Sequence, residues 1–253
     1  MAENVNEALV LAAGDGSLRG VKAALKAGAD IDFYEPDSDG TGPKPIPPCT
    51  ALHLACIMGH VDVVRLLLRK GASVVKRDRA SFAPLHSAVS KGWIKVVEVL
   101  LQHGATVDIR DGFQNTPLMA ACSYNHVDIV RLPIEFGARP DVDDGYIAER
   151  LKVEAENRVF AEESLKLLEE ARKSKLLRCC NPKCHKPDYR KNLKLCAGCK
   201  LTRYCSRDCQ KQHWSVGHKK CCGHDVYSDE QADPFQKMTV QLTKQLLEQA
   251  DQM

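Results

Sequence analysis

The sequence predicts a mainly α protein: a solenoid of helix-pair repeats, then a helical spacer and a small metal-stabilised module. One observation is a period of 33 residues at which a leucine and a glycine recur: Leu52, Leu85, Leu118, Gly71, Gly104 and Gly137. The other is that nine of the twelve cysteines lie between Cys179 and Cys222. A fixed period is typical of repeat arrays, and clustered cysteines are typical of metal sites.

The composition excludes several classes of protein. Hydrophobic residues make up 44% and charged residues 27% of the 253 residues, with a formal net charge of +3, which does not fit a disordered or membrane chain. Apolar runs such as residues 95–102 are too short to span a bilayer. The first ten residues lack a signal-peptide pattern. We therefore expect a cytoplasmic and/or nuclear protein, in which clustered thiols bind metal rather than form disulfides.

Each repeat is interpreted as two helices joined by a short turn. In the repeat that starts near residue 48, Leu52 and Ala55 recur at helical spacing, and so do Val63 and Leu67 further on. Gly59 or Gly92 separates the two helices of a unit. The period-33 glycine then ends the second helix, as a C′ glycine does.

The first turn of three units, "TALH" (50–53), "APLH" (83–86) and "TPLM" (116–119), resembles the ankyrin repeat family. The resemblance covers about residues 1–145, with units at about 5–33, 48–80, 81–113 and 114–145 and an insertion at 34–48. It implies an elongated solenoid with a concave surface that binds proteins. His53 and His86 are then expected to hydrogen-bond the turn, and Trp93 either packs between units or serves as a binding anchor.

The fourth unit departs from this pattern, because Pro133 falls inside its second helix. A proline there removes a hydrogen bond, so we expect a kinked or shortened helix and the approaching end of the array. Residues 146–178 are rich in strong helix formers. They are interpreted either as a degenerate fifth repeat or as a helical spacer.

Metal donors follow in four closely spaced pairs: Cys180 and Cys184, Cys196 and Cys199, Cys205 and Cys209, and His218 and Cys222. Eight donors suffice for two four-ligand zinc sites. Such closed sites are structural, because no coordination position remains for water or substrate. The spacing alone leaves open whether consecutive or alternating pairs share a metal.

The order of these pairs, together with "YCS", "CQ" and "HW" between them, resembles the MYND zinc finger over residues 180–222. The resemblance implies two structural Zn²⁺ ions held by alternating pairs. The first set would be Cys180, Cys184, Cys205 and Cys209, and the second Cys196, Cys199, His218 and Cys222. Cys179 is an alternative to Cys180 as the first ligand. We favour Cys180, because the loop from Cys179 to Cys184 would be one residue longer and looser. His213 and Cys221 are interpreted as neighbours of the ligands.

The same resemblance implies that Gln210 and Trp214 line a groove for a short proline-containing peptide. Alternatively, Trp214 only packs the small core. A competing hypothesis is nucleic-acid binding, because fifteen Lys and Arg between Arg172 and Lys220 face only two acids.

The sequence as a whole favours a non-enzymatic adaptor in which the array and the finger each bind a protein partner. No phosphate-binding loop, dinucleotide fingerprint or zinc-protease motif occurs, so we expect no catalysis. Residues 223–253 predict a short amphipathic helix that docks on the finger or on a partner, or else forms a frayed, solvated tail. Its expected apolar face consists of Phe235, Met238, Leu242 and Leu246.

Overall fold

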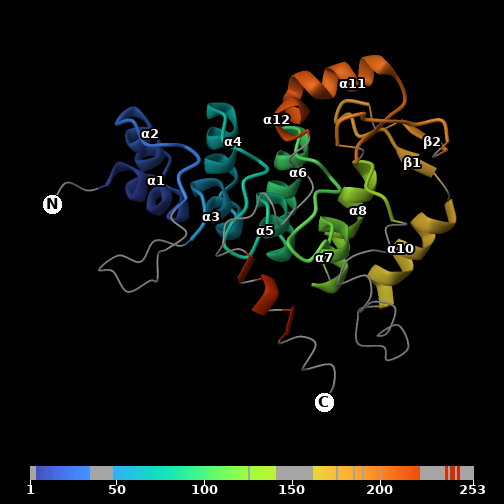
Figure 1. Cartoon of the computed structure of the whole chain (residues 1–253), viewed down its shortest axis with the longest axis horizontal. Coiled ribbons are helices and arrows are strands. Elements are labelled where there is room, and N and C mark those ends of the chain that lie inside the picture. Colours follow the sequence, from blue (N-terminus) through green and yellow to red (C-terminus); the bar gives the residue numbers. More distant parts are fainter. Residues whose placement is uncertain are drawn as a thin grey trace.

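A computed structural model describes residues 4–34, 48–124, 126–140, 162–174 and 176–222 without 185, 190 and 200, together with 237, 238, 240–242, 244 and 245. Helices dominate, as the sequence predicts. They stand in a row, and a cysteine-rich module of short strands and helices sits on one end of that row (Figure 1). None of the helices described has the length and hydropathy that a membrane span requires.

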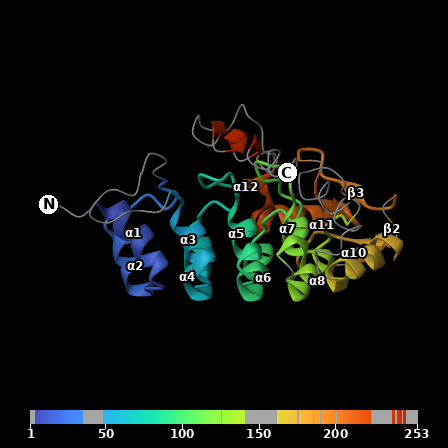
Figure 2. The same ribbon diagram turned by 90° about the horizontal axis from the view of Figure 1, so that it is seen from below.

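The first 140 residues contain four helix pairs, one in each predicted unit. They are α1 (Val5–Gly14) with α2 (Leu18–Lys26), α3 (Ala51–Met58) with α4 (Val61–Lys70), α5 (Pro84–Ser90) with α6 (Ile94–Gln102), and α7 (Pro117–Ser123) with α8 (Val127–Glu135). Figure 2 shows the pairs standing side by side. The unit boundaries themselves stay predictions.

The first helix of a pair begins where the sequence offers a cap. Thr50 and Thr116 accept hydrogen bonds from the backbone N–H three residues later. Pro84 and Pro117 stand at the first helical position, where a missing N–H costs nothing. A capping threonine, a proline at the first helical position, or both therefore fix where these helices start.

The core runs through the whole row rather than forming one centre. Leu52, Leu85 and Leu118 are at most 1% exposed and belong to one continuous apolar cluster. Each unit buries its apolar face against its neighbours, which is how a solenoid gains stability.

Two buried histidines tie the second unit to the third and the third unit to the fourth. His53 Nε2 donates to Phe82 O at 3.0 Å, while its Nδ1 lies 2.8 Å from Thr50 Oγ1. His86 Nε2 donates to Asn115 O at 3.2 Å. Burial lowers the pKa of both rings to about 4, so both are neutral near pH 7. The expected structural role of these two histidines is confirmed.

A second set of hydrogen bonds between units comes from the N-cap residues of α4, α6 and α8, whose side-chain rings bond to backbone carbonyls. The bonds join His60 Nε2 to Gly14 O, Trp93 Nε1 to Ile57 O and His126 Nε2 to Ser90 O, at 2.8, 2.9 and 3.2 Å. Each bond reaches the end of the first helix in the preceding unit. Trp93 thus takes the place of a histidine and packs between units, which favours the packing interpretation over a binding anchor.

The expected shortening at Pro133 is wrong. Helix α8 has nine residues and ends at Glu135, 33 residues after α6 ends at Gln102. Pro133 is the seventh residue of α8, so its missing N–H removes only one late hydrogen bond. The Pro133 carbonyl still accepts from Ala138 N at 2.8 Å, which closes the end of the helix.

Helix α10 (Glu162–Ser174) continues the row and lies against α8. Leu168 is buried, and Arg172 Nε donates to Pro140 O at 2.7 Å. Residues 141–161 lie outside the described part of the chain. The choice between a fifth repeat and a spacer for residues 146–178 therefore stays open, although α10 is docked on the array.

The cysteine-rich module consists of two short antiparallel ladders and a helical segment. Strand β1 (Leu176–Arg178) pairs with β2 (Pro187–Tyr189), and β3 (Lys194–Leu195) pairs with β4 (Arg203–Tyr204). The helical segment comprises α11 (Arg207–His213), the π-helical turn η1 (Trp214–His218) and α12 (Lys219–Cys221). Because β1 belongs to this module, the module begins before the predicted start at residue 180.

The module sits directly on the glycines that end α4, α6 and α8. A Cβ on Gly71, Gly104 or Gly137 would lie 3.5 Å from Lys220 Nζ, 2.8 Å from the Gly217 Cα and 2.5 Å from Arg178 O, respectively. We call this line of contacts the seam. All three glycines have φ between 89° and 98°, as C′ glycines do. They end helices as predicted, and they also let a second backbone approach closely.

The tail contacts the array through a residue that the pattern did not single out. Val240 is buried, and a Cβ on Gly112 would lie 2.6 Å from the Val240 Cγ2. Met238 and Leu242 are more than half exposed, so the predicted apolar face is not the packed one. Phe235 and Leu246 lie outside the described residues.

Candidate metal centre

Two groups of four donors come together in the module. The first consists of Cys179, Cys184, Cys205 and Cys209, and the second of Cys196, Cys199, His218 and Cys222. In each group the donor atoms all lie within 4.8 Å of one another. Pairs therefore alternate along the chain, as the resemblance implied.

Local structure explains how the first group assembles. Cys184 closes a turn in which its N–H donates to Asn181 O at 2.9 Å. Cys205 and Cys209 flank the start of α11, where Ser206 Oγ caps the helix by accepting from Cys209 N at 3.2 Å. Burial raises the pKa of the Cys209 thiol, but hydrogen bonds from Ser206 and Asn181 outweigh this and lower it to about 7.

The choice of Cys180 as a ligand is wrong, and Cys179 takes its place. Adjacent side chains of an extended chain point to opposite sides, so only one of the two can face the site. Cys180 turns toward the array, where its Sγ lies 3.8 Å from Gly137 O and 3.2 Å from Arg203 N. Burial raises the pKa of Cys180 to about 12, which keeps it a neutral thiol. The turn that ends at Cys184 makes the longer spacing from Cys179 compact.

The second group is built around a sharp turn and the end of the helical segment. Cys196 follows β3, and Cys199 comes three residues later across a turn that contains Gly198. A Cβ on Gly198 would lie 2.5 Å from Cys222 Sγ, so only glycine leaves room there for the fourth donor. His218 Nε2 lies 3.6 Å from Cys199 Sγ, and its ring is fully buried.

The spacing of the donors fits tetrahedral zinc. With Zn–S bonds of about 2.3 Å, two sulfurs of a tetrahedron lie about 3.8 Å apart, and a sulfur and a nitrogen about 3.6 Å apart. The Sγ–Sγ distance is 3.7 Å between Cys184 and Cys205, 3.5 Å between Cys205 and Cys209, and 3.5 Å between Cys196 and Cys222. A disulfide would need about 2.05 Å. Four protein donors in each group could therefore hold one metal ion each.

His213 is a neighbour of the second group, as expected, and has a packing role. Its Nδ1 lies 3.0 Å from the Tyr204 hydroxyl, and its ring stacks on His218 with centroids 5.1 Å apart. Burial lowers the pKa of His213 to about 3. The side chain of Cys221 lies outside the described part of the structure.

Gln210 and Trp214 share one face of the helical segment. They are four residues apart, and Trp214 N–H donates to Gln210 O, so the helix continues between them. Trp214 is 39% exposed, and its ring meets the His218 ring edge-on at a centroid distance of 5.9 Å. Trp214 therefore packs against a member of the second donor group and stays partly exposed to solvent.

Comparison with known families agrees with this geometry. The family models "Ankyrin repeats (3 copies)" and "Ankyrin repeat" match residues 78–144 and 49–79, and the model "MYND finger" matches residues 179–222. The chain carries ankyrin repeats followed by a MYND finger. The MYND match begins at Cys179, the residue that the structure brings to the first donor group. Both kinds of module are typical of protein interaction rather than catalysis.

One similar curated protein is ankyrin repeat and SOCS box protein 6 of Mus musculus, which is 35% identical over 77 residues. The aligned part is 30% of this chain but only 16% of that protein. This similarity therefore says little about the function of the whole chain.

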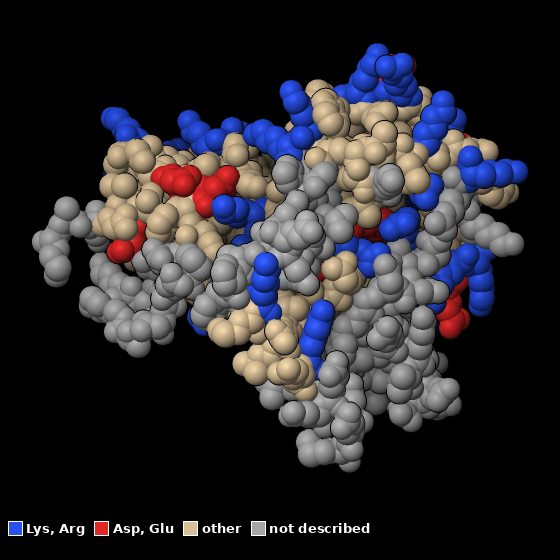
Figure 3. Space-filling view, in the orientation of Figure 1, with Lys and Arg blue, Asp and Glu red and all other residues tan. Residues whose placement is uncertain are grey.

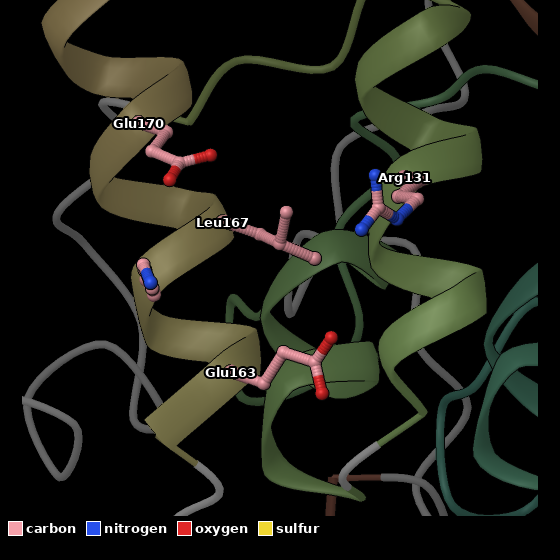
Figure 4. A pocket seen from close by; sticks show the side chains of 5 residues that line it. Arg131, Glu163, Leu167 and Glu170 are labelled. Carbon is pink, nitrogen blue, oxygen red and sulfur yellow. The ribbon is translucent and has the colours of Figure 1, made fainter.

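A pocket of about 430 Å³ lies between α8 of the ankyrin array and α10 (Figure 4). Arg131 of α8 faces Glu163, Leu167 and Glu170 of α10, and Lys166 completes the lining. The lining combines two acids, two bases and one leucine, with no thiol, hydroxyl or imidazole among these five side chains. The pocket lies where two charged helix faces meet, and these five side chains do not form a set of catalytic residues.

Proposed function

We propose that this chain is a non-enzymatic adaptor that joins two protein partners, one on the ankyrin array and one on the MYND finger. The finger would bind a short proline-containing peptide against Gln210 and Trp214, and two structural Zn²⁺ ions would hold these side chains in place. The chain would work in the cytoplasm, the nucleus or both, where thiols stay reduced.

One observation carries the proposal for the finger. The indole of Trp214 is partly exposed, yet it contacts His218, a member of the second donor group. A partly exposed aromatic ring that is held by a neighbouring ring suits a proline-rich segment, whose extended conformation is largely preformed. Gln210, on the same face, supplies a polar side chain for the peptide backbone.

The donor groups also support a role without catalysis. Each group offers four protein donors, so a zinc ion held there would have no open position for water or substrate. Zinc would then contribute only to folding of the finger. Methyl transfer or hydrolysis by the purified protein would contradict this part of the proposal.

The test is peptide binding with a matched aromatic control. Proline-containing peptides selected on an array would be titrated into the zinc-loaded full chain by fluorescence anisotropy. Trp214→Ala should weaken binding at least about tenfold, as loss of a central aromatic does. Tyr189→Ala removes another exposed aromatic of the finger, on β2, and should leave binding unchanged.

Two outcomes would contradict the peptide site. One is equal binding by both variants, and the other is the absence of any proline-dependent binding. Zinc content measured in parallel would show whether Trp214→Ala acts on the groove or on the metal site beneath it.

A further inference from the structure

The outer faces of α2 and α4 differ in charge from those of α6 and α8. Every charged residue of α2 is basic, and the only acid of α4 is Asp62 in its first turn. By contrast, α6 carries the Lys95–Glu98 ion pair, and α8 carries Asp128 and Glu135. The first half of the array thus presents cations to solvent, while the second half presents both signs.

The finger extends this basic surface across the seam. Helix α12 places Lys220 Nζ 3.5 Å from the position of a Cβ on Gly71, directly after Arg69 and Lys70 in the last turn of α4. We call the combined surface the basic band; its residues are Arg19, Lys22, Lys26, Arg65, Arg69, Lys70, Lys219 and Lys220, all exposed. Figure 3 shows Lys and Arg side chains along the upper edge of the array and on over the finger.

Few negative charges balance the centre of this band. Among the described residues, no ion pair involves Arg69, Lys70, Lys219 or Lys220. The carboxyl end of the α4 dipole offsets part of their charge, equivalent to roughly half an elementary charge. Four cations around one helix end therefore leave a positive surface that attracts an anionic partner.

The band begins close to the proposed peptide groove. Lys219 follows Trp214 by five residues, across the non-helical backbone of Gly217. An extended chain advances about 3.3 Å per residue, so the two Cα atoms are at most about 17 Å apart. A flank of about five residues would therefore reach Lys219, and a few residues more would reach the last turn of α4.

We propose that the finger and the array bind one peptide together: its proline segment lies against Trp214, and an acidic flank lies on the basic band. This inference rests on the proposed function and adds the second half of the recognition surface. An acidic peptide fits better than a nucleic-acid duplex, because on the array the cations gather on α2 and α4 and give way to charges of both signs on α6 and α8. A long phosphate backbone would need a continuous positive track along the array.

The experiment compares two fluorescent peptides that share the proline core chosen by the finger. One carries a flank of four glutamates and the other a flank of four glutamines, each placed on either end in turn. At physiological salt, the zinc-loaded wild-type chain should bind the better glutamate peptide about tenfold more tightly, since several exposed ion pairs of a few tenths of a kcal/mol add up to this factor. The Arg69→Glu/Lys70→Glu variant should abolish that preference.

Matched variants separate local charge from net charge and from misfolding. Lys91→Glu/Lys166→Glu makes the same change in net charge away from the band and should keep the preference. Arg69→Gln/Lys70→Gln places no acid at the end of α4 and should lose most of it. The glutamine peptide should bind all these variants equally.

The outcomes distinguish this inference from the proposed function. Equal binding of both peptides to the wild-type chain, with Trp214→Ala weakening both, overturns the basic band and leaves the peptide groove. If the chain prefers the glutamate peptide and Trp214→Ala leaves its affinity unchanged, the joint surface and the role of Trp214 are both overturned. A single-stranded oligonucleotide that displaces the glutamate peptide at lower concentration than the unlabelled peptide itself overturns the peptide in favour of nucleic acid.

Discussion

The ankyrin array and the MYND finger solve the same folding problem by different means. The array buries leucines such as Leu52, Leu85 and Leu118 in one continuous core that passes from unit to unit. The finger has strands of two or three residues and uses cysteines and a histidine at the centre of its fold. Burial of apolar surface stabilises the first, while metal binding would supply much of the folding free energy of the second.

The seam shows that the two regions are nevertheless not independent. The finger rests on the glycines that end the second helices of three successive repeats, so the period of the array is also the period of the docking surface. A change in the finger should therefore reach the array through these contacts. Two predictions test this coupling, and a third concerns the array alone.

The largest effect is expected from the first donor group. Cys179→Ser should lower bound zinc by at least one equivalent and destabilise the finger, because a structural zinc contributes on the order of 10 kcal/mol. Cys180→Ser should keep both ions, because Cys180 faces the array. Elemental analysis measures the zinc, and circular dichroism should show an array that stays helical but melts earlier in Cys179→Ser. Loss of zinc from Cys180→Ser would restore Cys180 as a ligand.

A smaller effect separates docking from backbone strain. Gly104 and Gly28 have similar φ values of +89° and +93°, but a Cβ on Gly28 would meet nothing within 4 Å. Gly28→Ala should cost about 1 kcal/mol of unfolding free energy from strain alone. Gly104→Ala should cost about 3 kcal/mol, because its methyl group also displaces Gly217. Urea denaturation of the zinc-loaded protein measures both, and equal losses would mean that the finger does not rest on this glycine.

The smallest effect is confined to the array and depends on pH. The pKa of His53 falls from 6.5 to about 4 on folding, because the ring is buried. The unfolded chain thus binds the proton first, and stability present above pH 6.5 is lost as the pH falls toward 4. His53→Gln should remove about 2 kcal/mol of the difference in stability between pH 7 and pH 5. Burial raises the pKa of Asp78 to about 6, so this carboxyl lowers the stability of the fold as the pH rises. Its contribution is the same in the wild type and in His53→Gln and therefore cancels in the comparison.

Urea denaturation at the two pH values provides this measurement. An identical pH dependence in wild type and variant would show that His53 titrates normally in the folded chain. His60 offers a control, because it is only half-buried and His60→Gln removes a ring from the same unit.

Sequence patterns predicted the parts of this molecule that rest on local rules. The helix pairs follow from apolar periodicity, N-caps and C′ glycines, and seven of the eight predicted metal donors come together as expected. Pro133 was misjudged because its cost depends on its place in the helix, near the end, where few hydrogen bonds remain. The tail prediction stays open, because Phe235 and Leu246 lie outside the described residues. An apolar stripe also does not reveal which residue meets a neighbour, and among the described apolar residues of that segment Val240 is the buried one.

The sequence by itself determined the repeat, the helices and the supply of metal donors, because each of these depends on residue type and on spacing along the chain. Tertiary structure decided between Cys179 and Cys180, since two adjacent side chains have the same spacing to within one residue but face opposite directions. It also gave the period-33 glycines their second role and joined Lys220 to the basic surface of α4. These features depend on which surfaces meet in space, and no pattern along a single chain records that.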